Sequence, residues 1–134
     1  MKMPCELIVW YVLPTIRREL AKELVGAYGM TQAEVAKRFG VTDAAISQYL
    51  RKKRGDSAVI ESSDLYPQFL SEVAESSRRI ASEGRDVSEE ICRICGCVKQ
   101  MGLLAEIYRA QGAKAPSGVC PSDPRLTRIQ RIAR

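Results

Sequence analysis

Residues 31–54 read TQAEVAKRFGVTDAAISQYLRKKR, and they carry the strongest local signals for helix starts, a turn and an apolar face. Thr31 and Glu34 form the capping-box pattern that begins a helix. Gly40 ends that helix, because a tight turn between packed helices needs a positive φ or a close approach. Thr42 then caps a second helix. The stretch therefore predicts two short helices joined by a tight turn.

The two predicted helices cover residues 32–39 and residues 43 to about 53. Apolar residues recur within them at the spacing that places side chains on one face of a helix. This inward face comprises Val35, Ala36, Phe39, Val41, Ile46, Tyr49 and Leu50. Ala36 is small at the point where the two helices must cross closely.

The second helix also has a polar outward side, formed by Asp43, Ala44, Ser47, Gln48 and Arg51. Serine, glutamine and arginine carry the donors and acceptors that read base edges in the major groove of DNA, and alanine can touch a thymine methyl group. The helix leads into the basic run at residues 51–54, which suits phosphate contacts. The alternative is an ordinary helical hairpin with a solvated basic end, but caps, turn and charge together favour DNA binding.

The stretch resembles the DNA-binding domain of lambda-repressor-like (Cro and XRE-type) transcriptional regulators. The likeness rests on Gln32 at the start of the first helix, the small Ala36, the turn at Gly40 and the apolar Ile46. In that family the residue at the Gln32 position contacts the DNA backbone or supports a side chain of the recognition helix. The candidate DNA-binding residues are Gln32, Thr42, Asp43, Ala44, Ser47, Gln48, Arg51 and Lys52.

Charge is unevenly distributed along the 134 residues. Residues 1–55 carry ten Lys and Arg against five Asp and Glu, for a net charge of +5. Residues 56–90 carry three basic and nine acidic residues, for a net charge of −6. Residues 91–134 carry eight basic and two acidic residues, for a net charge of +6. A basic head and an acidic middle segment fit a DNA-binding unit followed by a region with another role.

The start of the chain is apolar from Leu7 to Leu13 and contains the only tryptophan, Trp10. No run reaches the roughly 18 apolar residues that span a bilayer. Glu6 and the lack of a small-residue cleavage site argue against a signal peptide, so we expect a cytoplasmic protein without membrane contact. An apolar strip such as Leu7 to Leu13 must be buried. The favoured interpretation is burial within the protein, and the alternative is a dimer contact.

Three longer helices are predicted outside the opening stretch. The first runs from Pro14 to about residue 27; its apolar face is Ile16, Leu20, Leu24 and Val25, with Arg17, Arg18, Lys22 and Glu23 outside. After a linker at residues 55–63, a second helix covers 64 to about 82 and ends at Gly84. Ser88 caps a third, long helix.

Four cysteines mark the C-terminal part of the chain. Cys92, Cys95 and Cys97 are spaced as C-x2-C-x-C, and Cys120 precedes a proline; the chain has no histidine. In an intracellular protein, such thiols more often form a metal or redox site than a disulfide set. The tight spacing and the Cys-Pro pair favour an iron–sulfur cluster of the 4Fe-4S type. A zinc site is the second possibility. The third is that the thiols bind no metal or form disulfides.

Helix geometry separates these cysteines. On a continuous helix Cys92 and Cys95 share a face, whereas Cys97 points roughly the other way. Either the helix begins after Cys97, with Gly96 letting a loop wrap the metal, or Cys97 is a buried core thiol and Cys5 is the replacement ligand. The loop at residues 112–124 would return Cys120 over Cys92 and Cys95. A basic amphipathic helix at residues 124–134 could contact DNA phosphates or form a solvated end.

The whole chain also resembles small archaeal transcriptional regulators with a Cys-bearing C-terminal half. The likeness is carried by PCELIVWYVLPTIRREL at residues 4–20 and by the helix-turn-helix. The resemblance implies control of transcription.

We therefore expect an all-α protein with a lambda-repressor-like helix-turn-helix domain at residues 1–56 and a helical, Cys-rich dimerisation and metal-binding region at residues 57–134. The expected function is that of a homodimeric, sequence-specific regulator that binds a palindromic operator in double-stranded DNA. Its iron–sulfur or metal centre would sense redox or iron state. The alternatives are a regulator with a structural zinc and, less favoured, a thiol redox protein. The sequence has no phosphate loop, catalytic dyad or nucleotide fingerprint, so we expect no enzyme.

Overall fold

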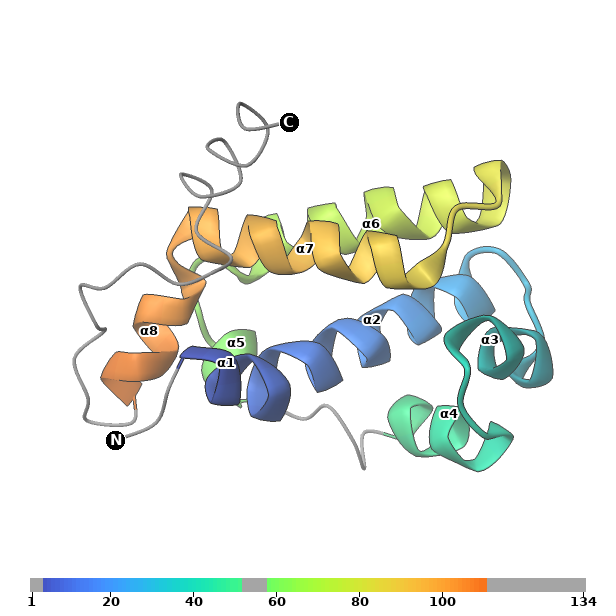
Figure 1. Ribbon diagram of the computed structural model, residues 1–134, viewed down its shortest axis with the longest axis horizontal. Coiled ribbons are helices and arrows are strands. Elements are labelled where there is room, and N and C mark those ends of the chain that lie inside the picture. The colour runs from blue at the N-terminus through green and yellow to red at the C-terminus, as the bar shows by residue number, and fades with distance from the viewer. Residues whose placement is uncertain (1–3, 52–57, 111–134) are drawn as a thin grey trace, which may run out of the picture.

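The computed structural model of the protein describes residues 4–51 and 58–110. Within those ranges the chain is helical and has no strand, which confirms the all-α fold. The elements are α1 Pro4–Leu7, the π-helical turn η1 Ile8–Val12, α2 Leu13–Gly26, α3 Gln32–Phe39, α4 Asp43–Leu50, α5 Ala58–Glu61, α6 Tyr66–Glu83, α7 Val87–Met101 and α8 Leu103–Ala110 (Figure 1). No helix among the described residues is long and apolar enough to cross a membrane.

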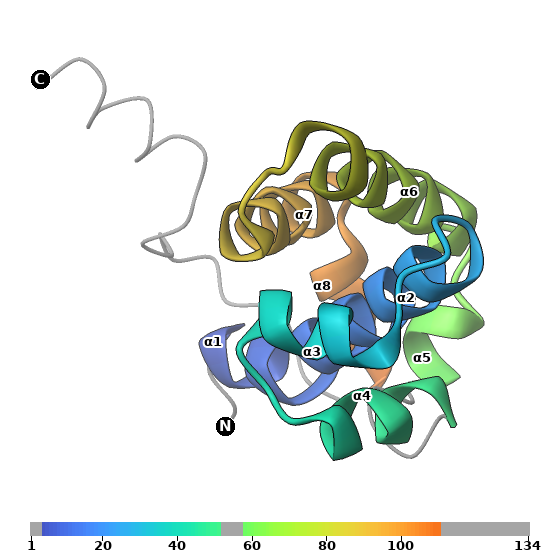
Figure 2. The ribbon, with the colours of Figure 1, turned by 90° about the vertical axis from the view of Figure 1, so that its right-hand side faces the viewer.

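The central helix of the protein is α2. It contacts α3 and α4 as well as α6 and α7, and it runs between these two pairs of helices in both views (Figures 1 and 2). Ile16, Leu20 and Leu24 are buried on it, as predicted. Buried apolar residues on both sides of the predicted boundary at residues 56 and 57 belong to one cluster. The division into two regions stays a prediction, but the two regions share a core.

Arg18 on α2 corrects one expectation, because its side chain is fully buried rather than outside. Its Nη2 lies 2.7 Å from Oε1 of Glu19 and 2.6 Å from Oε1 of Glu61 on α5. The hydroxyl of Tyr66 donates to the same Glu19 oxygen at 3.1 Å. Burial lowers the pKa of Arg18, but the two carboxylates outweigh burial and raise it above its ordinary value. The charge is thus tolerated inside because it is paired.

The apolar strip at the start of the chain is only partly buried. Leu7 and Val12 belong to the core, whereas Val9 and Trp10 are 55% and 64% exposed. The favoured interpretation, burial of the whole strip within the protein, is therefore wrong for Trp10. The physical reason is that α1, η1 and α2 follow one another as helix, and a helix turns only one side toward its core. The alternative of a dimer contact stays open for this residue.

The hairpin of α6 and α7 packs on α2. Gly84 ends α6 with a φ of 66°, as predicted. Two details differ from the sequence pattern: Asp86 rather than Ser88 is the N-cap of α7, and Gly102, with a φ of 87°, breaks the expected long helix into α7 and α8. The apolar spacing continues through Gly102, so periodicity could not reveal the break.

The predicted linker contains a short helix, α5. Its residue Ile60 is fully buried in the common core, and α5 contacts α8. The segment is therefore part of the fold at residues 58–61 rather than a simple connection. Four helical residues between serine-rich flanks are too few to produce a recognisable helical period.

Candidate DNA-binding surface

The first helix of the candidate site, α3, begins and ends as the sequence predicts. The Thr31 hydroxyl oxygen accepts a hydrogen bond from the Glu34 backbone N–H at 3.1 Å. In return the Thr31 N–H donates to Oε2 of Glu34 at 3.2 Å, which completes the capping box. Gly40 follows the helix with a φ of 67°, in the left-handed region that glycine adopts readily. The backbone direction of the turn is therefore set locally.

The second helix, α4, is shorter than predicted. The Thr42 hydroxyl oxygen accepts from the Ala45 N–H at 3.1 Å, so Thr42 is the N-cap as expected. The helix ends at Leu50 instead of near residue 53, because the backbone of Arg51 has left the helical region, with φ −87° and ψ 7°. Lys52 and the rest of the predicted basic run lie outside the described residues.

Packing between the two helices fixes their relative orientation. Val35 and Ala36 on α3 are buried, as are Ile46 and Tyr49 on α4, and Phe39, Val41 and Leu50 pack partly buried against the same core. These residues match the predicted inward face. Ala45 is also buried and was not predicted, although it precedes the inward-facing Tyr49 by four positions and so shares its side of the helix.

The remaining side of α4 is accessible. Asp43, Ala44 and Arg51 are exposed, and Ser47 and Gln48 are half-buried. Positions 43, 44, 47, 48 and 51 lie on one side of a helix by spacing, so a continuous polar surface runs along α4 away from the core. Gln32 and Thr42, at the starts of α3 and α4, are exposed as well. Contact of any of these residues with DNA stays a prediction.

Comparison with known families agrees with this geometry. A family model described as helix-turn-helix matches residues 19–55, which include part of α2 and all of α3 and α4. This part of the chain is therefore a helix-turn-helix of the lambda-repressor-like, XRE type, and the protein is a DNA-binding transcriptional regulator. No curated protein and no solved structure matches the chain.

The described cysteines on α7 do not converge on one point. Cys92 is exposed, Cys95 is half-buried, and all three thiols of Cys92, Cys95 and Cys97 are free. Burial raises the pKa of Cys95 to about 11, an effect that the nearby Lys99 and Arg17 charges oppose. Cys97 lies on the other side of α7, its Sγ 3.6 Å from Oε2 of Glu72.

This arrangement bears on both interpretations of Cys97. The helix passes through Gly96 without a loop, so the expectation that it begins after Cys97 is wrong. Cys97 is half-buried beside charged groups and is not an apolar core thiol either. Cys120 lies outside the described residues, as does the side chain of Cys5. Among the described side chains, no group of three or more His, Cys, Asp or Glu residues is placed to hold a metal ion.

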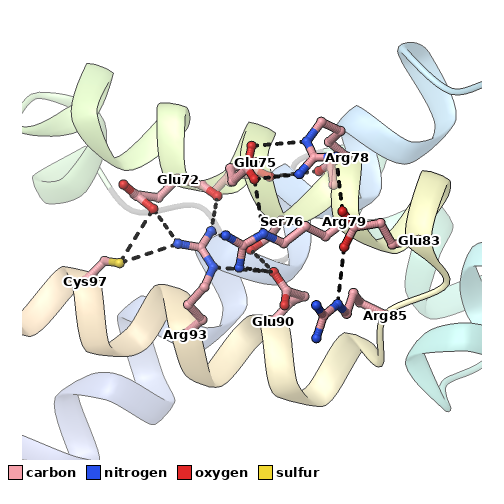
Figure 3. A network of polar contacts seen from close by, with 12 residues as sticks. Glu72, Glu75, Ser76, Arg78, Arg79, Glu83, Arg85, Glu90, Arg93 and Cys97 are labelled. Carbon is pink, nitrogen blue, oxygen red and sulfur yellow. Dashed lines mark hydrogen bonds and ion pairs between the residues drawn. The ribbon is translucent and has the colours of Figure 1, made fainter.

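A polar network between α6 and α7 was not predicted (Figure 3). Arg93 donates to Oε2 of Glu72 at 2.5 Å and to the Ser76 hydroxyl at 2.8 Å. Ser76 donates in turn to Oε1 of the buried Glu90 at 2.9 Å. The Arg93 guanidinium holds the pKa of Glu72 below its ordinary value, and burial raises that of Cys97. Glu72 and Arg93 are 21 positions apart on different helices, so helical spacing does not pair them and only the packing of α7 on α6 brings them together.

Proposed function

We propose that the protein is a homodimeric, site-specific regulator that reads a palindromic operator through the exposed side of α4. The observation that carries the proposal is the polar surface of α4 on a helix-turn-helix whose caps and turn are all formed. One helix of eight residues reaches only a few base pairs. Two copies related by a two-fold axis read half-sites about one helical turn, or ~10 base pairs, apart, which supports the dimer.

Selection of bound duplexes from a random-sequence pool tests this proposal. We expect the wild-type chain to enrich an inverted repeat, with two chains bound per duplex in sedimentation. Affinity should fall steeply with salt, because Lys and Arg contacts displace counterions from phosphates. Enrichment of an asymmetric site bound by one chain would refute the dimer, and no enrichment at all would refute site-specific reading.

We also propose that Cys92 and Cys95 supply two thiolates to a metal centre, either an iron–sulfur cluster or zinc. Their shared position on α7 and the positive charges of Lys99 and Arg17 beside Cys95 favour this, because bound thiolates are anionic. The remaining ligands would come from Cys120 and Cys5 or from a second chain.

The ultraviolet–visible spectrum and metal analysis of protein purified without oxygen distinguish these centres. Absorption near 400 nm with iron and sulfide would support a cluster. A colourless sample with about one zinc per chain, or about one per two chains if a second chain supplies ligands, would support zinc. Cys92→Ser should remove the metal, whereas Cys97→Ser should retain it, since Cys97 lies on the other side of α7. Metal-free wild-type protein would overturn the centre and leave DNA binding untouched.

A further inference from the structure

A long-range hydrogen bond joins the helix-turn-helix to the α6–α7 hairpin. Arg38, in the last turn of α3, donates from Nη1 to the backbone carbonyl oxygen of Ile80 at 3.1 Å. Ile80 lies in the last turn of α6, and its own side chain is fully buried. In both ribbon views the turn between α6 and α7 lies above α3 (Figures 1 and 2), and α3 also contacts α7.

The way in which α6 ends makes this carbonyl available. In a continuing helix the Gly84 N–H would bond to the Ile80 carbonyl. Gly84 instead adopts a left-handed conformation and donates to the carbonyl of Arg79. The last carbonyls of a helix lack partners within it and form the negative end of the helix dipole. A guanidinium is a strong donor for such a group, because the bond is charge-assisted.

Both partners of the bond are held by their own surroundings. Arg79, which precedes Ile80, lies 3.1 Å from Glu75 and 3.7 Å from the buried Glu90 of α7, so the end of the hairpin is tied across its two helices (Figure 3). On the other side, α3 shares its buried face with α4. A residue that holds α3 on the hairpin therefore also holds α4.

We propose that Arg38 is a positioning residue, which docks the helix-turn-helix on the C-terminal end of α6 and so lets the hairpin set the orientation of α4. The inference rests on the DNA-binding function proposed above. It gives Arg38 a role other than the phosphate contact that a basic residue on this unit would suggest. A rearrangement of the hairpin reaches the DNA-binding surface through this bond.

Two variants that each remove one positive charge from α3 test the proposal. Arg38→Gln removes the bond to Ile80. Lys37→Gln is the matched control, because Lys37 is the neighbouring exposed cation in the same turn and its side chain has no partner among the described residues. Amide hydrogen exchange of the free proteins and DNA affinity at several salt concentrations are the two measurements. The probe is the duplex that the wild-type chain selects from a random pool.

For Arg38→Gln we expect faster exchange in the last turn of α6 and in α3 and α4, with α2 unchanged. DNA affinity should fall about fivefold, the loss expected for one partly exposed charge-assisted bond. The slope of log affinity against log salt should equal that of the wild type, since no phosphate contact is lost. Lys37→Gln should leave exchange at these sites unchanged.

Two outcomes would overturn the inference. Wild-type exchange in Arg38→Gln would show that the bond does not hold the two units together. A salt slope reduced by about one would identify Arg38 as a phosphate contact instead. The exchange measurement needs no DNA, so it decides the docking role even if duplex selection fails and the proposed function falls with it.

Discussion

A single side chain, Arg18, shows how tertiary pairing overrides a sequence pattern. An arginine on an amphipathic helix is expected on the solvent side, and Arg18 is not one of the residues that form the predicted apolar face of α2. The carboxylates of Glu19 and Glu61 instead hold it at zero exposure. Glu61 is 43 positions away on the short α5, so helical spacing on α2 carries no information about it.

Replacement of Arg18 should be costly for stability. Arg18→Met leaves the carboxylate of the buried Glu19 without its main partner, and we expect a loss of about 3 kcal/mol in the free energy of unfolding. Lys22→Met is the control, because the exposed Lys22 also pairs with Glu19, but at 3.7 Å from Nζ to Oε2. Loss of such an exposed ion pair should change stability by less than about 1 kcal/mol. Urea unfolding measures both. Equal small losses in the two variants would contradict the structural role of the buried pair.

At the same scale, Gln48 and Arg51 separate sequence reading from phosphate binding. Gln48→Ala should relax base choice at one operator position, with a loss of about 1–3 kcal/mol in discrimination and an unchanged salt slope. Arg51→Ala should weaken binding to all sequences and lower the salt slope by about one. Selection from a random-sequence pool measures the base choice of both variants, and salt titration measures the slope of their affinity. An unchanged selected sequence for Gln48→Ala would remove Gln48 from the reading surface.

Among the elements, α3 and α4 are the pair whose ends and connecting turn depend most on residues close in the sequence. Their caps lie within three residues of the groups they bind, and the turn between them depends on the positive φ of Gly40. The hairpin of α6 and α7 is the opposite case, since Arg93 meets Glu72 only after the two helices have packed.

The turn at Gly40 predicts a purely conformational effect. Gly40→Ala should cost about 1 kcal/mol, because a left-handed φ strains an alanine although no neighbour lies within 4 Å of an added Cβ. Gly26→Ala, at an equally open site without a positive φ, is the control and should be neutral or slightly stabilising. Thermal unfolding compares the two. A neutral Gly40→Ala would mean that the turn adjusts without strain.

On the scale of the whole molecule, α2 belongs to both the DNA-binding unit and the hairpin. The buried residues of α2 contact helices on both sides of the predicted boundary at residues 56 and 57. The Arg38 bond and the buried pair of Arg18 with Glu61 cross the same boundary. A change in the position of the hairpin can therefore reach the helix-turn-helix through direct contacts with α2 and α3.

This shared core predicts the behaviour of a fragment. Residues 1–56 alone should unfold without a cooperative transition, because α2 would expose the apolar side that α6 and α7 cover. Circular dichroism during thermal unfolding of the fragment and of the full chain measures this. A cooperative transition at the temperature of the full chain would show that residues 1–56 are an independent domain, as the sequence boundary suggests.

Elements whose causes are local could be predicted from the amino-acid sequence. The caps at Thr31 and Thr42, the turns at Gly40 and Gly84 and the inward face of α3 and α4 all depend on residues a few positions apart. The family match at residues 19–55 covers both caps and the turn at Gly40. For that reason the class of protein and the candidate DNA-binding surface follow from the amino-acid sequence alone.

Contacts between side chains of different helices could not be predicted in this way and depend on the folded chain. It buried Arg18, exposed Trp10, split the last long helix at Gly102, placed Cys97 beside Glu72 and joined Arg38 to Ile80. Helical spacing states which residues share a face, but it does not state what that face contacts. Those contacts depend on how α2 packs against both pairs of helices, which is a property of the whole chain.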